Sequence, residues 1–191
     1  MTDRTYWQGN LVRLRAIEPD DAEFYFRLNK QLFVDRNQDQ VYPPSSLHRQ
    51  RSWIEETSKE GFKEDGGFRF QIEALESGEL TGCIDTHHCD PRTGVFSYGI
   101  ALDERFRGKG YAREAVLMVM RYYFFELRYQ KCDVGVFDFN EDSSRLHERL
   151  GFVLEGRRRR ATYTGGKHHD MLLYGMTVEE FRELHAEYVE L

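Results

Sequence analysis

The residues best suited to chemistry in this chain lie at positions 105–112, where the sequence reads RFRGKGYA. This stretch precedes a long apolar segment with helical spacing, and the first amides of a helix carry no intrahelical acceptor and a positive dipole end. Its two glycines let the main chain approach a phosphate that a Cβ would block. Arg105, Arg107 and Lys109 add positive charge beside those amides. The segment therefore predicts a cradle for a diphosphate group.

Two better-known nucleotide motifs do not fit this segment. A Walker loop has Ser or Thr after its lysine to bind magnesium, whereas Gly110 follows Lys109 here. The G-x-G-x-x-G dinucleotide fingerprint is not matched either. The plainer alternative is a basic, glycine-containing turn that binds no ligand.

A second informative stretch, residues 140–152, reads NEDSSRLHERLGF. Asn140 is a strong helix N-cap type, and the acids that follow it suit a first helical turn. Helical spacing places Ser143, His147 and Leu150 on one face of this short helix. A histidine in that position is either a satisfied, half-buried side chain or a proton donor.

Together these segments resemble the GNAT superfamily of N-acetyltransferases. Arg107-x-x-Gly110-x-Ala112 resembles the family motif Q/R-x-x-G-x-G/A, and the frame that begins at Arg105 also fits it. Residues 140–152 resemble the second signature, N-x-x-S-x-x-x-Y-x-x-x-G-F. The segments 12–21 and 155–170 are similar to the RimJ/RimL-like branch, so the resemblance covers nearly the whole chain.

The resemblance implies that acetyl-CoA lies in a gap between two splayed parallel strands, here 95–102 and 131–139. Its diphosphate would lie on the amides of residues 107–112, its pantetheine arm would pair with strand 95–102, and an amine would attack the thioester without an acyl-enzyme. The residues expected to bind this co-substrate are Ile100, Ala101, Leu102, Arg105, Arg107, Gly108, Lys109, Gly110, Tyr111, Ala112, Asn140, Ser143 and Arg145.

The resemblance also implies catalytic roles for His147 and Asn140. The family usually has tyrosine at the position of His147, as general acid towards the CoA sulfur. Here an imidazolium, or a water ordered by the imidazole, would protonate the leaving thiolate; alternatively, the histidine only fills the space of the tyrosine. Asn140 either caps its helix, lies near the pantetheine or the oxyanion, or does both.

The general base is harder to assign from the sequence. Many relatives carry a glutamate near the position of Ser97, but the strand 95–102 contains no acid. The role passes in our interpretation to Asp85, His87 or His88 on the neighbouring strand, or to a chain of waters.

The elements that must position these residues follow from hydrophobic periodicity. Alternating or apolar runs predict strands at 10–17, 68–75, 80–87, 95–102, 131–139, 152–163 and 169–176. Helical spacing and cap signals predict helices from residue 18, over 47–62, over 112–124, over 140–150 and from Thr177. Short turns imply antiparallel neighbours, whereas the helix 112–124 implies a parallel crossover. The predicted fold class is α/β, a GNAT-like mixed, mostly antiparallel sheet flanked by helices, as one N-acetyltransferase domain over residues 1–191.

Composition restricts the class of protein further. The chain of 191 residues has 27 Lys and Arg against 33 Asp and Glu, a net charge of −6, which argues against nucleic-acid and anionic-membrane partners. Its three cysteines form no C-x-x-C pair, which favours a reducing compartment. The first ten residues have no apolar signal core, so we expect a soluble cytoplasmic protein. The cluster His87-His88-Cys89-Asp90 lacks the spacing of a zinc site, so no metal is expected.

The sequence thus predicts an acetyl-CoA-dependent N-acetyltransferase that acts on a primary amine. The acceptor remains open among a protein N-terminus, a polyamine, an aminoglycoside and an amino-acid-like metabolite, and the acidic net charge favours a cationic one. Residues 31–46, the helix 47–62 and the hairpin 163–170 are expected to set acceptor specificity. The alternative is a catalytically idle acetyl-CoA-binding regulatory module. Whether the chain forms a homodimer stays open.

Overall fold

The computed structural model describes residues 5–31, 41–61 and 66–189. Within them, seven strands form one sheet in the order β1-β2-β3-β4-β5-β7-β6. The strands are β1 Val12–Arg15, β2 Arg69–Ala74, β3 Leu80–Asp90, β4 Val95–Leu102, β5 Lys131–Phe137, β6 Val153–Thr164 and β7 Lys167–Thr177. Neighbouring strands run antiparallel except β4 and β5, which are parallel, so the predicted mixed, mostly antiparallel sheet is confirmed.

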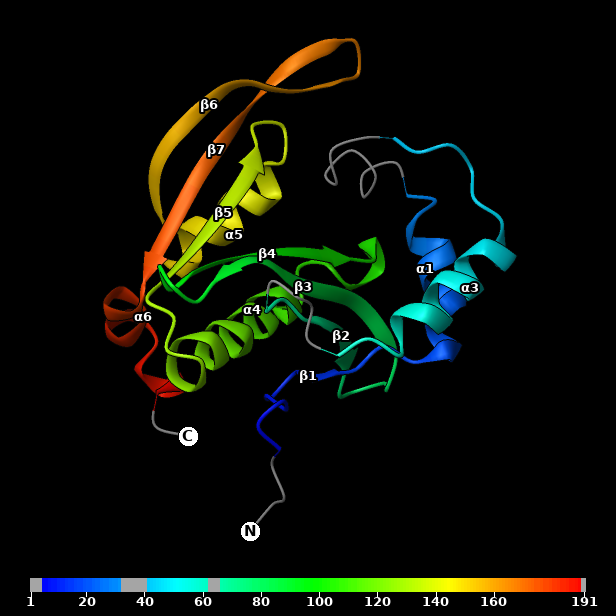
Figure 1. The fold of residues 1–191 in the computed structure, drawn as a ribbon, viewed down its shortest axis with the longest axis horizontal. Helices are drawn as coiled ribbons and strands as arrows, with labels where there is room; N and C mark the ends of the chain where they lie inside the picture. The colour runs from blue at the N-terminus through cyan, green and yellow to red at the C-terminus, as the bar shows by residue number, and fades with distance from the viewer. Residues whose placement is uncertain (1–4, 32–40, 62–65, 190–191) are drawn as a thin grey trace.

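The helices lie on both sides of this sheet (Figure 1). The α-helices are α1 Ala22–Leu28, α3 Leu47–Thr57, α4 Tyr111–Arg121, α5 Glu141–Leu150 and α6 Val178–Leu184. The shorter elements are the 3₁₀ turns η1 Pro19–Asp21, η2 Glu104–Phe106 and η4 Ala186–Tyr188, and the π-helix η3 Tyr122–Glu126. None of the helices in the described ranges is long and apolar enough to cross a bilayer.

The parallel pairing of β4 with β5 is short. It joins residues 95–97 to residues 131–133 and goes no further. Beyond it the two strands separate, and β5 rises away from β4 to pair with β7 along its whole length (Figure 1). The splayed pair that the sequence predicts is therefore present, and it leaves the far half of β4 without a neighbour on its β5 side.

Helix α4 makes the crossover between these two strands and fills one face of the sheet. Its apolar stripe, which includes Ala115, Val116 and Val119, is buried against even-numbered residues of β1 to β4 such as Ile84 and Phe96. We call this the back face. Odd-numbered residues of β3 and β4 point the other way, towards α1 and α3, and we call that side the front face; Cys83 packs there against the α1–α3 cluster.

Several element boundaries differ from the predictions for local reasons. Strand β1 starts only at Val12, because Glu114 of α4 takes the N–H groups of residues 10–12 at 2.7–2.8 Å. The helix predicted to reach Phe124 changes to π geometry at Tyr122. Strand β3 continues to Asp90 through a bulge at which His88 has φ +50. The second predicted helix, 47–62, ends at Thr57. Residues 32–40 of the segment 31–46, which is expected to set acceptor specificity, lie outside the described part of the chain.

Glu114 supports the first testable prediction. Glu114 is 5% exposed and accepts three main-chain hydrogen bonds, one buried and two partly buried, so Glu114→Ala removes the acceptor of all three. We expect the free energy of unfolding to fall by roughly 3 kcal/mol in urea denaturation, with little change in m. The control is Glu56→Ala on the exposed surface of α3. Equal losses in the two variants would contradict this account.

Candidate active site

The predicted diphosphate cradle forms the N-terminus of α4. Gly108 and Gly110 have φ +75 and +86, left-handed values that glycine adopts without strain. Gly110 is the N-cap residue, and no side chain caps the first amides of α4. On either side Phe106 and Tyr111 are buried and anchor the loop. The first amides of α4 therefore have no side-chain cap from Gly110, and the two glycines place no Cβ beside them.

The cationic side chains of the cradle are partly committed to neighbouring acids. The guanidinium of Arg105 binds buried Asp103 at 2.9–3.2 Å, which offsets its charge. The Lys109 ammonium lies 3.4 Å from Glu76, which also accepts a 2.6 Å hydrogen bond from the Tyr111 hydroxyl. Much of the positive charge of Arg105 is therefore offset by Asp103, and its contact with a diphosphate stays a prediction.

The open edge of β4 lies beside this cradle. Its parallel pairing ends at Ser97, so the main chain of Ile100, Ala101 and Leu102 faces the gap rather than a neighbouring β5 strand. On the other side these three residues pair with β3 at Ile84, Cys83 and Gly82. A strand edge of this kind binds an extended chain by main-chain hydrogen bonds, as a pantetheine arm requires.

Helix α5 brings Asn140 and His147 towards the gap. The side chain of Asn140 accepts a 3.2 Å hydrogen bond from the Ser143 N–H, so its role as helix cap is confirmed. Arg145 pairs with Glu141 and Asp142 on the exposed surface of α5. Two of the expected ligands are thus engaged within their own helix.

His147 is 1% exposed and uses both ring nitrogens. Nδ1 lies 2.7 Å from the Ser143 carbonyl, which can only accept, so Nδ1 carries the proton. Nε2 then accepts from the Tyr98 hydroxyl at 2.9 Å. Burial lowers the pKa of His147 to about 4, although the hydrogen bond to Ser143 acts to raise it. The expected imidazolium does not fit this environment, because the ring is neutral near pH 7 and its nitrogens are occupied.

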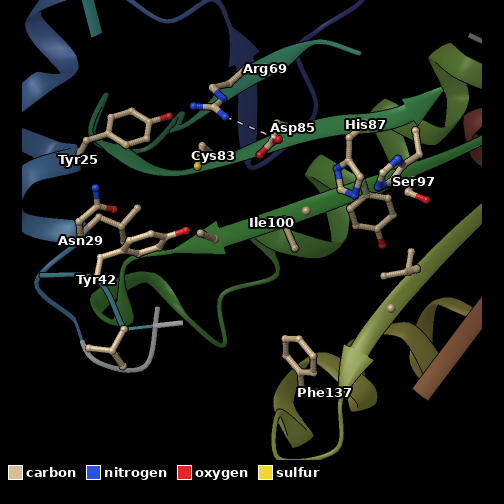
Figure 2. A pocket seen from close by; sticks show the side chains of 18 of the residues that line it. Tyr25, Asn29, Tyr42, Arg69, Cys83, Asp85, His87, Ser97, Ile100 and Phe137 are labelled. Atoms are coloured by element: carbon tan, nitrogen blue, oxygen red, sulfur yellow. Dashed lines mark ion pairs between the residues drawn. The ribbon is translucent and has the colours of Figure 1, made fainter. Parts of the chain in front are cut away.

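A cleft of about 1700 Å³ opens on the front face of the sheet. It is lined by α1, α3, residues 41–45, and residues of β2 to β7, including Tyr98 and Val134 from the other side of the sheet at the gap between β4 and β5. Figure 2 shows Tyr25, Asn29, Tyr42 and Arg69 towards one side of this cleft, Asp85 nearer its middle, and Phe137 of β5 at the other side. The gap between β4 and β5 opens into it, because residues of both diverging strands line its wall.

Polar side chains cross the floor of the cleft in two rows. His87, Ser97 and Asp133 are paired in register on β3, β4 and β5, at the point where the strands begin to separate. Asp85 is paired with Gly99 one row further along. A Cβ placed on Gly99 would lie 3.9 Å from His87 Cε1 and 4.0 Å from Asp85 Oδ1. Two proton-accepting side chains therefore flank the bare backbone of β4.

The structure also identifies cleft residues that the sequence analysis missed. Asp133, Glu155 and Arg158 line the cleft. Alternation along β5 could have placed Asp133 there, but the irregular register of β6 hides the positions of Glu155 and Arg158 from sequence analysis. The hairpin 163–170, which was expected to set acceptor specificity, does not line the cleft. His169 in this hairpin instead contacts Asp138 at 2.8 Å. Among residues the structure describes, no group of three or more His, Cys, Asp or Glu is placed to hold a metal ion.

Known proteins are similar to this chain in sequence. The family model of the acetyltransferase (GNAT) domain matches residues 12–153. The SPbeta prophage-derived uncharacterized N-acetyltransferase YokL of Bacillus subtilis is 41% identical over 182 residues, which cover 95% of this chain and 98% of YokL. The "Putative ribosomal N-acetyltransferase YdaF" of Bacillus subtilis is 29% identical over 89% of this chain and 93% of its own length.

Solved structures agree with these sequence matches. The spermidine N-acetyltransferase of Vibrio cholerae, crystallised with CoA and spermine, superposes with a TM-score of 0.76 at 21% identity, over 89% of this chain and 97% of that chain. An acetyltransferase of T. thermophilus gives 0.78 at 25% identity, over 95% and 94% of the two chains. The chain belongs to the GNAT acetyltransferase family. It is an acetyl-CoA-dependent N-acetyltransferase, and the uncapped helix amides and open strand edge fit that co-substrate.

The neutral state of His147 supports a second prediction. The pKa of this histidine is near 6.5 in the unfolded chain and about 4 in the folded protein, so stability is lost as the pH falls through this range. Between pH 7 and pH 5 we expect the wild type to lose about 2 kcal/mol more unfolding free energy than His147→Gln. Urea denaturation at both pH values measures this difference. Parallel losses in the two proteins would show that the histidine titrates freely.

Proposed function

We propose that this enzyme transfers the acetyl group of acetyl-CoA directly to a primary amine that enters through the front cleft. One observation carries this proposal: the gap between β4 and β5 is bordered by the uncapped amides of α4 and opens into the cleft. Two reactants that approach from opposite sides of one sheet meet at the point of strand separation, and such positioning accounts for much of an acyl transfer rate.

Direct transfer, without an acyl-enzyme, agrees with the raised pKa values of two buried cysteine thiols. Cys83 lines the cleft, but burial, helped by Asp85, raises the pKa of its thiol to about 11. Cys132 is fully buried, and burial raises the pKa of its thiol well above the usual value. Because the thiolate is the nucleophile, these groups are poor sites for an acyl-enzyme.

The co-substrate would be held mainly by main-chain groups. In this proposal the amides of residues 107–112 bind the diphosphate, and Ile100, Ala101 and Leu102 pair with the pantetheine arm. Arg107 adds charge at the cradle, whereas Arg105, Lys109 and Arg145 are already paired with acids and add less. Asn140 and Ser143, at the start of α5, would contact the pantetheine arm or the thioester in this proposal.

The proton of the attacking amine goes to a polar side chain of β3 on the front face. We assign its acceptance to His87, supported by Asp85, because both flank the backbone of β4 at Gly99. His147 has a positioning role in this scheme: its neutral ring accepts from the Tyr98 hydroxyl and so fixes a side chain that lines the cleft next to the gap. Membership of the RimJ/RimL-like branch is part of the proposal and is supported by the similarity to YdaF.

The cradle is tested by coenzyme A binding. Gly108→Ala places a Cβ on a residue with φ +75, which forces the loop to shift the amides that bind the diphosphate. We expect calorimetry with coenzyme A to show at least tenfold weaker binding. Gly78→Ala is a matched control, because Gly78 has φ +68, also has open space around its Cβ position, and lies in the β2–β3 turn.

Similar coenzyme A affinities in the two glycine variants would remove the cradle from the proposal. Retained coenzyme A binding in the wild type, without amine-stimulated thiol release, would instead indicate an acetyl-CoA-binding module.

The proposed base is tested by kinetics. His87→Gln should lower kcat at least tenfold, because general-base assistance contributes roughly 10²- to 10⁴-fold in such reactions. Coenzyme A affinity should stay within twofold, since the side chain lies on the front face. His48→Gln on the exposed surface of α3 controls for loss of a histidine. Unchanged turnover in both His87→Gln and Asp85→Asn would show that neither side chain accepts the proton and that solvent does.

A further inference from the structure

The wall of the cleft opposite β5 contains a guanidinium that lacks hydrogen-bond partners among the described residues. The side chain of Arg69, at the start of β2, is 23% exposed, and its Nη2 lies 3.7 Å from Asp85 Oδ2, too far for a hydrogen bond. Its Nε is buried and has no acceptor in the described part of the chain. The guanidinium also lies over the Trp53 ring, 5.1 Å from the centroid. A half-buried cation whose donors lack an acceptor is costly unless a ligand supplies one.

The position of Arg69 relates it directly to the transfer point. Arg69 is paired with Asp85 and Asp85 with Gly99, so the three residues form one row across β2, β3 and β4. Figure 2 shows the side chains of Arg69 and Asp85 facing each other in this row. Neighbouring strands are roughly 5 Å apart, which places the Arg69 backbone about 10 Å from that of Gly99. A molecule with its amine beside Gly99 can therefore extend a second group to Arg69.

The charge along this wall is positive even though the chain carries −6. Lys30, just after α1, and Arg49 of α3 also line the cleft, and neither makes an ion pair with a described residue; the Lys30 ammonium lies 3.9 Å from the Phe26 centroid. The acids on the opposite wall, Asp133 and Glu155, are both paired with Lys131, at 3.0 and 2.7 Å. The local field therefore opposes the cationic acceptor that net charge alone favours.

We propose that the acceptor carries a carboxylate as well as its primary amine, and that Arg69 binds this carboxylate. The planar fork of an arginine matches the two oxygens of a carboxylate, so the unpartnered donors of Arg69 would be satisfied in one contact. Asp85 lies between Arg69 and Gly99, and its carboxylate attracts the amine end of the acceptor. The edge-to-face rings of Tyr25 and Trp53 provide an apolar wall for the carbon chain between them. This inference rests on the proposed function and deepens it.

The acceptor class is tested with matched amines. Two series, H₂N–(CH₂)ₙ–COO⁻ and H₂N–(CH₂)ₙ–NH₂ of equal length, differ in the distal group alone, and thiol release from acetyl-CoA measures their kcat/KM. We expect at least a tenfold preference for the amino acids at the best length. The peptides Ala-Glu-amide and Ala-Gln-amide form a further arm, which distinguishes an acidic peptide from a small amino acid as the source of the carboxylate.

Variants at Arg69 separate recognition from folding. Arg69→Gln should raise KM for the preferred amino acid at least tenfold, with kcat changed less, and Arg69→Glu should shift the preference towards diamines. Arg92→Gln, in the β3–β4 turn outside the cleft, is the control. Calorimetry with coenzyme A should give wild-type affinity in all three, which shows that the co-substrate site is intact.

Equal or better use of the diamines by the wild type would overturn the carboxylate assignment, as would an unchanged preference in Arg69→Glu. Failure of every amine in the panel while coenzyme A still binds would overturn it too. Loss of coenzyme A binding in the wild type itself is a different result, because it contradicts the proposed function rather than the acceptor class.

Discussion

The parallel pairing of β4 with β5 stops after three residues, and the active site depends on this interruption. Continued pairing would satisfy the edge of β4 and close the sheet. Because β5 turns away to pair with β7, the edge at residues 98–102 is left for another extended chain. The same separation joins the back of the sheet, where α4 presents its amides, to the cleft on the front. Two reactants can therefore meet without any covalent intermediate on the protein.

The crossover helix ties this gap to the rest of the chain. Its N-terminus follows β4 through a loop with two left-handed glycines, and its apolar stripe forms the largest part of the core. Glu114, one turn into α4, holds the chain segment before β1 by three main-chain hydrogen bonds. The buried helix, together with the buried rings of Phe106 and Tyr111, therefore holds the cradle in place.

Local electrostatics in the cleft differ from those of the whole chain. A net charge of −6 is an average over the surface, whereas a bound molecule responds to the side chains within a Debye length and to their partners. Here the acids on one wall are paired with Lys131 at 3.0 and 2.7 Å, whereas Arg69 on the other wall has an ion pair with Asp85 at 3.7 Å, beyond hydrogen-bond distance. His147 shows the same principle: its residue type suggests a proton donor, but burial makes it a neutral hydrogen-bond acceptor for Tyr98.

The sequence by itself determined the elements and the co-substrate motifs. The glycines before α4, the cap at Asn140 and the alternation of the strands are local signals, and local backbone preferences are enough to predict them. It could not decide the protonation of His147 or the freedom of Arg105 and Arg69. Those depend on which side chains meet across the sheet, and the register that places Arg69 beside Asp85 and Gly99 exists only in the tertiary structure. Burial and pairing are properties of that packing, because they arise from residues far apart in the chain.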